Sequence, residues 1–65
     1  MTFKQGDIIV HKKSKNAYVF LVLKAGPFRF EILTLRHFYK ECVGEKFSFY
    51  SYDLKSYSLL QDTKL

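Results

Sequence analysis

Five short runs of β-branched and aromatic residues occupy most of this 65-residue chain, and turn-forming residues separate them. The runs cover residues 7–12, 17–24, 28–36, 46–52 and 57–60. Gly6-Asp7 opens the first run, and Ala25-Gly26-Pro27 ends the second, because glycine accepts positive φ and proline cannot donate to a strand ladder. Short strands at this spacing are typical of a small closed β-barrel.

The connections between the first three runs decide the fold class. The first connection is Lys13-Ser14-Lys15-Asn16, and the second is shorter still. Parallel strands need crossover connections of about a dozen residues or more, so a parallel α/β architecture is excluded. We therefore predict an all-β fold: one domain over residues 1–65, folded as a five-stranded antiparallel barrel that closes on itself to remove its edges.

Apolar and polar residues alternate along the third and fourth runs, as they do in strands with one buried face. The alternation predicts that these side chains fill the barrel: Phe28, Phe30, Ile32, Phe47 and Phe49. The second run is apolar on both faces, which predicts a strongly bent strand at the centre of the sheet.

Residues 37–44 are the least regular part of the chain. Phe38, Tyr39 and Cys42 recur at helical spacing, and Gly44 could end a short helix. We favour a long loop, because a helix of about nine residues is marginal without tertiary support. Asp53-Leu54-Lys55-Ser56 predicts a tight or 3₁₀ turn before the last strand, since Asp and Ser bond to their own backbone.

Length and cysteine content limit how the chain is stabilised. One cysteine, Cys42, cannot form an intrachain disulfide, so stability must come from packing, to which twelve aromatic residues contribute. Cys42 itself is expected to be a small buried apolar residue. The unpaired cysteine, the lack of a signal-peptide pattern and the lack of an apolar run of about 18 residues favour a cytoplasmic protein.

The positive charge is concentrated in one part of the sequence. The net charge is +5, but residues 1–40 hold eight basic and two acidic residues, a net charge of +6. Residues 41–65 hold three basic and four acidic residues, a net charge of −1. Such a field favours encounters with phosphate backbones or acidic proteins, and it also keeps a small apolar protein soluble.

The order of these elements resembles the SH3-like and KOW-like small barrels. The resemblance is carried by Phe3-Lys4-Gln5-Gly6-Asp7-Ile8-Ile9 and by residues 53–60, and it spans nearly the whole chain. It implies four main strands, a 3₁₀ turn and a short fifth strand. Small stand-alone proteins of this kind are common in bacterial viruses and mobile elements, which suggests a phage protein. Proline-rich peptide binding is disfavoured, because the chain has no tryptophan and its first connection is basic.

Catalytic and metal-binding patterns are not evident in the sequence. His11 and His37 are the only histidines, and Cys42 follows His37 at a spacing that does not suit paired metal ligands. The glycines stand singly, so no phosphate-binding glycine loop is present. We predict a protein that is not an enzyme and that holds no metal or cofactor.

Two hypotheses of different classes remain for a small binding module. The first is docking on a protein with an acidic surface, for instance as a phage-encoded modulator of a host factor. If Phe47 and Phe49 face inward, then Tyr50 and Tyr52 face outward beside Lys46. The predicted protein-binding residues are Lys46, Tyr50, Tyr52, Arg29, Arg36 and Lys40.

The alternative is direct binding of nucleic acid, single-stranded or without sequence preference, with tyrosines stacking on bases. The predicted phosphate contacts are Lys12, Lys13, Lys15, Arg36 and Lys40. Protein docking is favoured, because these basic residues are mostly lysines scattered over several strands. Homodimerisation through the aromatic face is compatible with either hypothesis, and simple cross-strand packing of the tyrosines remains an alternative to any binding role.

Overall fold

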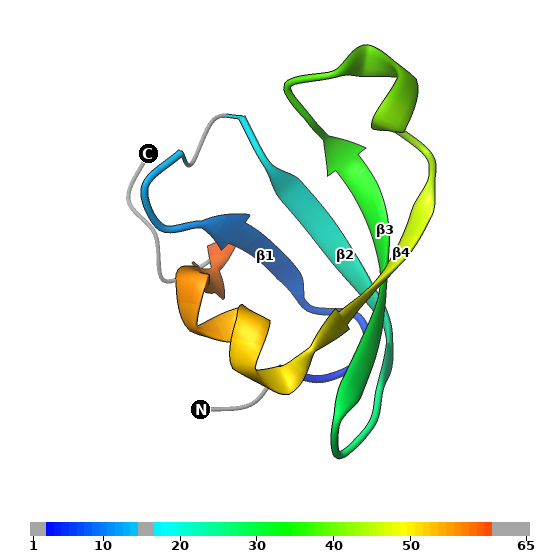
Figure 1. Cartoon of the computed structure of the whole chain (residues 1–65), viewed down its shortest axis with the longest axis vertical. Helices are drawn as coiled ribbons and strands as arrows, with labels where there is room; N and C mark the ends of the chain where they lie inside the picture. The colour runs from blue at the N-terminus through cyan, green and yellow to red at the C-terminus, as the bar shows by residue number, and fades with distance from the viewer. Residues whose placement is uncertain (1–2, 15–16, 61–65) are drawn as a thin grey trace.

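A computed structural model describes residues 3–14 and 17–60 of the chain. Five antiparallel strands form one sheet in the order β4-β3-β2-β1-β5 (Figure 1). The strands are β1 (Ile8–His11), β2 (Val19–Ala25), β3 (Arg29–Arg36), β4 (Lys46–Tyr50) and β5 (Tyr57–Leu59). Two 3₁₀ segments interrupt them, η1 (Lys40–Cys42) and η2 (Ser51–Ser56). The all-β antiparallel prediction is confirmed, and none of the helical segments in the described ranges is long and apolar enough to cross a membrane.

β2 lies at the centre of the sheet, as its two apolar faces predict. It pairs with β1 on one side and with β3 on the other. Its ladder with β3 shifts register twice, between Val19 and Phe20 and between Val22 and Lys24. Such irregularities bend and twist a strand, so β2 contributes to both halves of the curled sheet.

The two edge strands approach each other through side chains. η2 carries the chain from the end of β4 to β5, which pairs with the outer side of β1 (Figure 1). The Phe49 ring of β4 stacks on the Tyr57 ring of β5, with centroids 5.3 Å apart. The hydrogen-bonded ladders found among the described residues join β4 only to β3 and β5 only to β1. The two edge strands of the curled sheet are therefore joined by η2 and by aromatic packing rather than by a hydrogen-bonded ladder.

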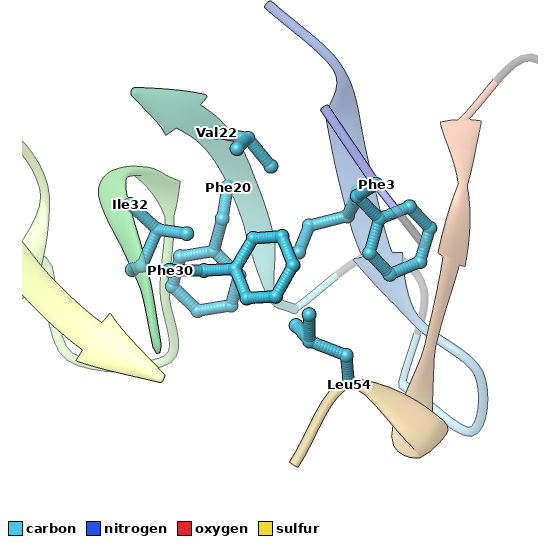
Figure 2. Close-up of a cluster of buried hydrophobic side chains, with 7 residues drawn as sticks. Phe3, Phe20, Val22, Phe30, Ile32 and Leu54 are labelled. Atoms are coloured by element: carbon cyan, nitrogen blue, oxygen red, sulfur yellow. The ribbon is translucent and has the colours of Figure 1, made fainter. Parts of the chain in front are cut away.

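The core fills the inner face of this sheet. Figure 2 shows the side chain of Leu54 reaching from η2 toward the rings of Phe30 and Phe3. Full burial of each such side chain stabilises the fold by about 1.5 to 3 kcal/mol. The buried cluster consists of Phe3, Ile9, Phe20, Val22, Phe30, Ile32 and Leu54.

The alternation along β3 and β4 predicts the core only in part. Phe30 and Ile32 are buried, as expected. Phe28 is 74% exposed, so its predicted inward position is wrong: it precedes β3, in a tight turn that the Gly26 N–H closes on the Arg29 carbonyl. Phe47 pairs with Ile32 and belongs to the inner face, yet it is 41% exposed.

The β3–β4 connection is a loop, as favoured, and within it only Lys40–Cys42 is helical, as η1. Gly44 has φ +87° and donates its N–H to the Thr34 carbonyl. The predicted turn before β5 is also present, but η2 begins at Ser51 rather than Asp53. Tyr52 therefore lies in η2 and not in a strand. The end of β3 and the starts of β4 and β5 lie where they were predicted, and the remaining strand ends differ from the predicted ones by one or two residues.

Candidate functional site

An open cleft lined entirely by aromatic rings lies at the end of the sheet that carries the β1–β2 and β3–β4 connections. Its volume is about 440 Å³. β1, β2, β4 and β5 each contribute side chains, and two more come from the residue before β2 and the residue after β3. The lining residues are His11, Tyr18, Phe20, His37, Phe47, Phe49 and Tyr57. We call this the aromatic cleft.

The cleft continues the inner face of the sheet beyond the core. Side chains two apart on a strand share a face, so His11 follows Ile9 on the inside of β1, and Tyr18 lies just before β2 on the same side as Phe20. His11 pairs with Tyr57 across the β1–β5 ladder. The alternation of side chains that places Ile9 and Phe20 in the core thus also directs the His11 and Tyr18 rings into the cleft.

Edge-to-face contacts hold the rings in place. The Tyr18 and His37 rings lie 4.9 Å apart at 81°, and the His11 and Tyr57 rings lie 5.3 Å apart at 87°. His11 also contacts Tyr18, at 5.9 Å and 64°. Aromatic pairs in this geometry contribute about 0.5 to 1.5 kcal/mol beyond burial, so the walls are ordered before any ligand arrives.

Both histidines accept backbone hydrogen bonds at Nδ1. The N–H groups of Lys13 and Ser14 each donate to His11 Nδ1 at 3.2 Å. The Tyr39 N–H donates to His37 Nδ1 at 3.0 Å. In each neutral ring the hydrogen is therefore on Nε2, because Nδ1 serves as the acceptor. Among residues 3–14 and 17–60, no hydrogen-bond acceptor is found for either Nε2–H.

Tyr57 contributes a hydroxyl to the cleft wall. Its pKa is raised above 10.0, first by burial, then by the negative charge of Asp53 and by Tyr18. The hydroxyl consequently stays protonated at neutral pH and serves as a donor and acceptor.

A basic notch adjoins the cleft. It measures about 270 Å³, and His11 lines both spaces. The Lys12 N–H donates to the Ser56 carbonyl at 2.8 Å, which joins the β1–β2 connection to the end of η2. This contact draws three lysines together, and the notch is lined by His11, Lys12, Lys13, Lys55 and Ser56. Three lysines that line so small a space suit an anion.

The β3–β4 connection adds exposed aromatic and basic residues at the same end. Phe38 and Tyr39 are largely exposed, and the Tyr39 ring stacks on His37 at 5.9 Å. Arg36 ends β3, and Lys40 begins η1. Acidic residues also lie in this part of the molecule: Glu41, Glu45 and, in η2, Asp53.

Most of the basic residues predicted to contact nucleic acid converge at this end. Val19 pairs with both Val10 and Arg36, so the β1–β2 and β3–β4 connections leave the same end of the sheet (Figure 1). Lys12 and Lys13 lie in the first connection, and Arg36 and Lys40 lie at the second. Lys15 falls outside the described residues.

The residues predicted to bind protein do not form one surface. Arg29 pairs with Tyr50 on the outer face, and its Nη2 donates to Ser48 Oγ at 3.4 Å. The Tyr50 and Tyr52 rings stack in parallel, 5.6 Å apart at 2°, and are 50% and 66% exposed. We call Arg29, Tyr50 and Tyr52 the tyrosine ledge.

Three of the predicted protein-binding residues lie away from the tyrosine ledge. Arg36 lies at the opposite end of β3 from Arg29, about 23 Å away along a strand that rises about 3.3 Å per residue. Lys40 follows Arg36 in the β3–β4 connection, and Lys46 pairs with Leu33, between the two ends. The predicted surface therefore divides into two.

Sequence reasoning missed the aromatic cleft, although the signal was present. The period of two that marks Ile9 and Phe20 as core residues also marks His11 and Tyr18 as their inner-face neighbours. Where the inner-face positions of a strand end in rings that carry polar atoms, the core is expected to end and an open site to begin. The missing information was the register that joins His11, His37 and Tyr57.

Residues 3–14 and 17–60 contain no group of three or more His, Cys, Asp or Glu side chains arranged to hold a metal ion. Cys42 is a half-buried free thiol rather than a core residue. Comparison with models of protein families, with curated protein sequences and with solved structures finds no match for this chain.

Proposed function

We propose that this protein is a small non-enzymatic module that binds single-stranded nucleic acid at the end carrying the β1–β2 and β3–β4 connections. One observation supports this above all: the aromatic cleft and the three-lysine notch share His11. Proteins that bind single strands combine aromatic platforms for bases with positive charge for phosphates. The lone cysteine of the chain favours a cytoplasmic setting.

The local charge agrees with an anionic ligand. Five basic side chains of the described residues surround this end, against the three acidic ones named above. Two of the five, Arg36 and Lys40, flank the exposed rings of Phe38 and Tyr39. The scatter of lysines along the sequence, which favoured protein docking, thus carries less weight once the fold is known. The five are Lys12, Lys13, Arg36, Lys40 and Lys55.

A salt titration tests the proposal. Binding of a fluorescent single-stranded oligonucleotide is followed by anisotropy at increasing salt concentration. Each neutralised phosphate contributes a slope of about −0.7 in log K against log[salt], so three lysine contacts give about −2. Lys12→Ala/Lys13→Ala should reduce the slope by about 1.4.

Lys4→Ala/Lys24→Ala is the matched control, because both lysines are exposed and lie in other parts of the fold while the loss of charge is the same. The control should keep the wild-type slope. Equal losses for the two variants would attribute binding to net charge alone, and undetectable binding at low salt would reject the proposal.

Protein docking at the tyrosine ledge is the second candidate function. The parallel Tyr50–Tyr52 stack is exposed and ordered without a partner, and Arg29 lies beside it. Tyrosine and arginine are enriched among residues that dominate binding energy at interfaces, and a preordered surface loses less entropy on binding. In the phage setting that the resemblance suggests, the partner would be a host protein with an acidic surface.

A pull-down from nuclease-treated host lysate tests this candidate. Tyr50→Ala/Tyr52→Ala should lose a partner that wild type retains, because the stack is removed. Phe38→Ala/Tyr39→Ala removes two exposed rings at the other end and serves as the control. Identical proteins recovered by all three forms would exclude the ledge, and size-exclusion chromatography of each form reports any self-association.

A further inference from the structure

We infer that the aromatic cleft is a pocket for one unpaired nucleobase that presents carbonyl oxygens, namely uracil, thymine or guanine, with the attached phosphate in the adjacent lysine notch. This inference rests on the proposed function and adds the site and the chemistry of the base. It concerns the cleft, which the sequence did not indicate.

The hydrogen-bonding groups of the cleft determine which bases it favours. His11 and His37 each hold Nδ1 as an acceptor for backbone N–H groups, so each neutral ring has only Nε2–H to offer a ligand. Two fixed donors match the carbonyl oxygens of uracil, thymine and guanine better than the amino-bearing edges of adenine and cytosine. The Tyr57 hydroxyl can donate or accept and does not oppose this choice.

Stacking supplies the affinity. Phe47 is the most exposed ring of the cleft and lies beside the aromatic packing of Phe20, Phe49 and Tyr57. A base entering the cleft covers the Phe47 face that water now contacts. Stacking of one base on an aromatic ring accounts for about tenfold or more in affinity. Bases in a duplex are already stacked and paired, so the pocket favours single strands.

The notch explains why the ligand is a nucleotide rather than a cation. Aromatic cages also bind quaternary ammonium groups through cation–π attraction. Here Lys12, Lys13 and Lys55 line the space next to the cleft and repel a cation. The Asp53 carboxylate, whose charge acts on Tyr57 in the cleft wall, already accepts a hydrogen bond from the Tyr50 N–H at 3.1 Å. Charge complementarity therefore selects an anionic ligand with a flat ring.

Mononucleotide titrations locate the ligand. Inorganic phosphate, uridine 5′-monophosphate, adenosine 5′-monophosphate and choline are added separately, and NMR shifts of the backbone amides and aromatic rings are recorded. Phosphate should shift only the residues of the notch, around Lys12, Lys13 and Lys55. Uridine monophosphate should shift the His11, His37 and Phe47 rings as well, and more strongly than adenosine monophosphate. Ring shifts with choline but not with uridine monophosphate would overturn the inference.

Two variants test the pocket in oligonucleotide binding. Phe47→Ala should weaken binding of oligo(dT) about tenfold and reduce its preference over a duplex of equal length. His37→Phe keeps an aromatic ring but lacks Nε2–H, so it should bind about as tightly while losing a few-fold preference for oligo(dT) over oligo(dA). Thermal unfolding of each variant verifies that it is folded.

The outcomes separate the pocket from the proposed function. Salt-dependent oligonucleotide binding that neither Phe47→Ala nor His37→Phe alters would retain the proposed function and reject the base pocket. Failure of wild type to bind any oligonucleotide would reject both.

Discussion

The inner face of the sheet has the same strand geometry at its two ends, but one end is sealed by a core and the other is open to solvent. At one end Phe3, Phe30 and Leu54 seal an apolar core. At the other end His11 and Tyr57 stand in equivalent inner-face positions and leave a cleft of about 440 Å³. The backbone rule is the same at both ends, so the difference lies in the side chains.

Polar ring atoms explain why the second end stays open. The Nε2–H of His11 and the hydroxyl of Tyr57 lose hydrogen bonds to water if they are sealed in an apolar core, which costs several kcal/mol without a replacement partner. Phe3 and Leu54 carry no such atoms and can close over the core completely. When the inner-face residues of one strand are apolar at one end and amphipathic rings at the other, that strand contributes both to the core and to an open site.

Truncations on the two sides of this boundary should give the largest contrast. Ile32→Ala removes a fully buried side chain and should cost about 2 to 5 kcal/mol of unfolding free energy, a large share of the about 3 to 10 kcal/mol expected for a domain of this size. Phe47→Ala, on the neighbouring strand, should cost less, because Phe47 is 41% exposed. Urea unfolding followed by circular dichroism measures both.

The control for this contrast is Phe28→Ala, which removes a ring that is largely exposed outside both regions and should leave stability nearly unchanged. If Phe47→Ala destabilised the fold as strongly as Ile32→Ala, the cleft would be part of the core rather than a separate site.

Alternation and turn residues were sufficient to predict the fold class. Gly26-Pro27 and the short connections excluded parallel strands, and the apolar faces of β2 predicted its central place. Alternation fails for Phe28, because it indicates the inner face of a strand and Phe28 lies before the strand begins. It also misjudges Phe47, since facing inward buries a ring only where something covers it.

The candidate site was predictable in its charges but not in its rings. The sequence predicts phosphate contacts at Lys12, Lys13, Lys15, Arg36 and Lys40, and this role stays a prediction. The sequence did not indicate that those in the described part of the chain lie beside a cleft, because the cleft depends on the register that brings His11 to Tyr57 and Val19 to Arg36. Pairing between strands far apart in sequence is a tertiary property that periodicity within one strand does not contain.

Turn glycines on the two sides provide the next largest test. Gly6 (φ +93°) precedes β1 near the sealed core, and Gly44 (φ +87°) precedes β4 near the cleft. A Cβ at either position meets no heavy atom within 4 Å, so Ala adds only backbone strain, about 1 to 2 kcal/mol. Denaturant unfolding should give similar losses for Gly6→Ala and Gly44→Ala. A much smaller loss at Gly44 would indicate that the open end rearranges around the substitution.

Thr34 lies at the boundary between the two ends, and its substitution should raise stability. Its side chain is 1% exposed, pairs across the ladder with Phe20, and carries a hydroxyl with no hydrogen-bond partner in the described part of the chain. Thr34→Val keeps the shape and removes the buried polar atom, for an expected gain of about 1 kcal/mol. Thr34→Ser, which keeps the hydroxyl and removes a methyl group, should instead lower the urea midpoint. A loss of stability in the valine variant would place an acceptor near the hydroxyl.

The smallest expected effect is an alkaline one at the cleft wall. Burial, Asp53 and Tyr18 raise the pKa of Tyr57 above its ordinary 10.0, so the folded state favours the neutral phenol. The resulting stabilisation is complete below pH 10 and is lost as the pH rises through the raised pKa of the folded state. Urea midpoints measured across this range should therefore fall more steeply for wild type than for Tyr57→Phe, and only modestly, because solvent reaches the half-buried ring. Parallel curves for the two proteins would mean that the Tyr57 hydroxyl is as well solvated in the folded state as in the unfolded chain. The cleft wall would then have the same dielectric environment as open surface.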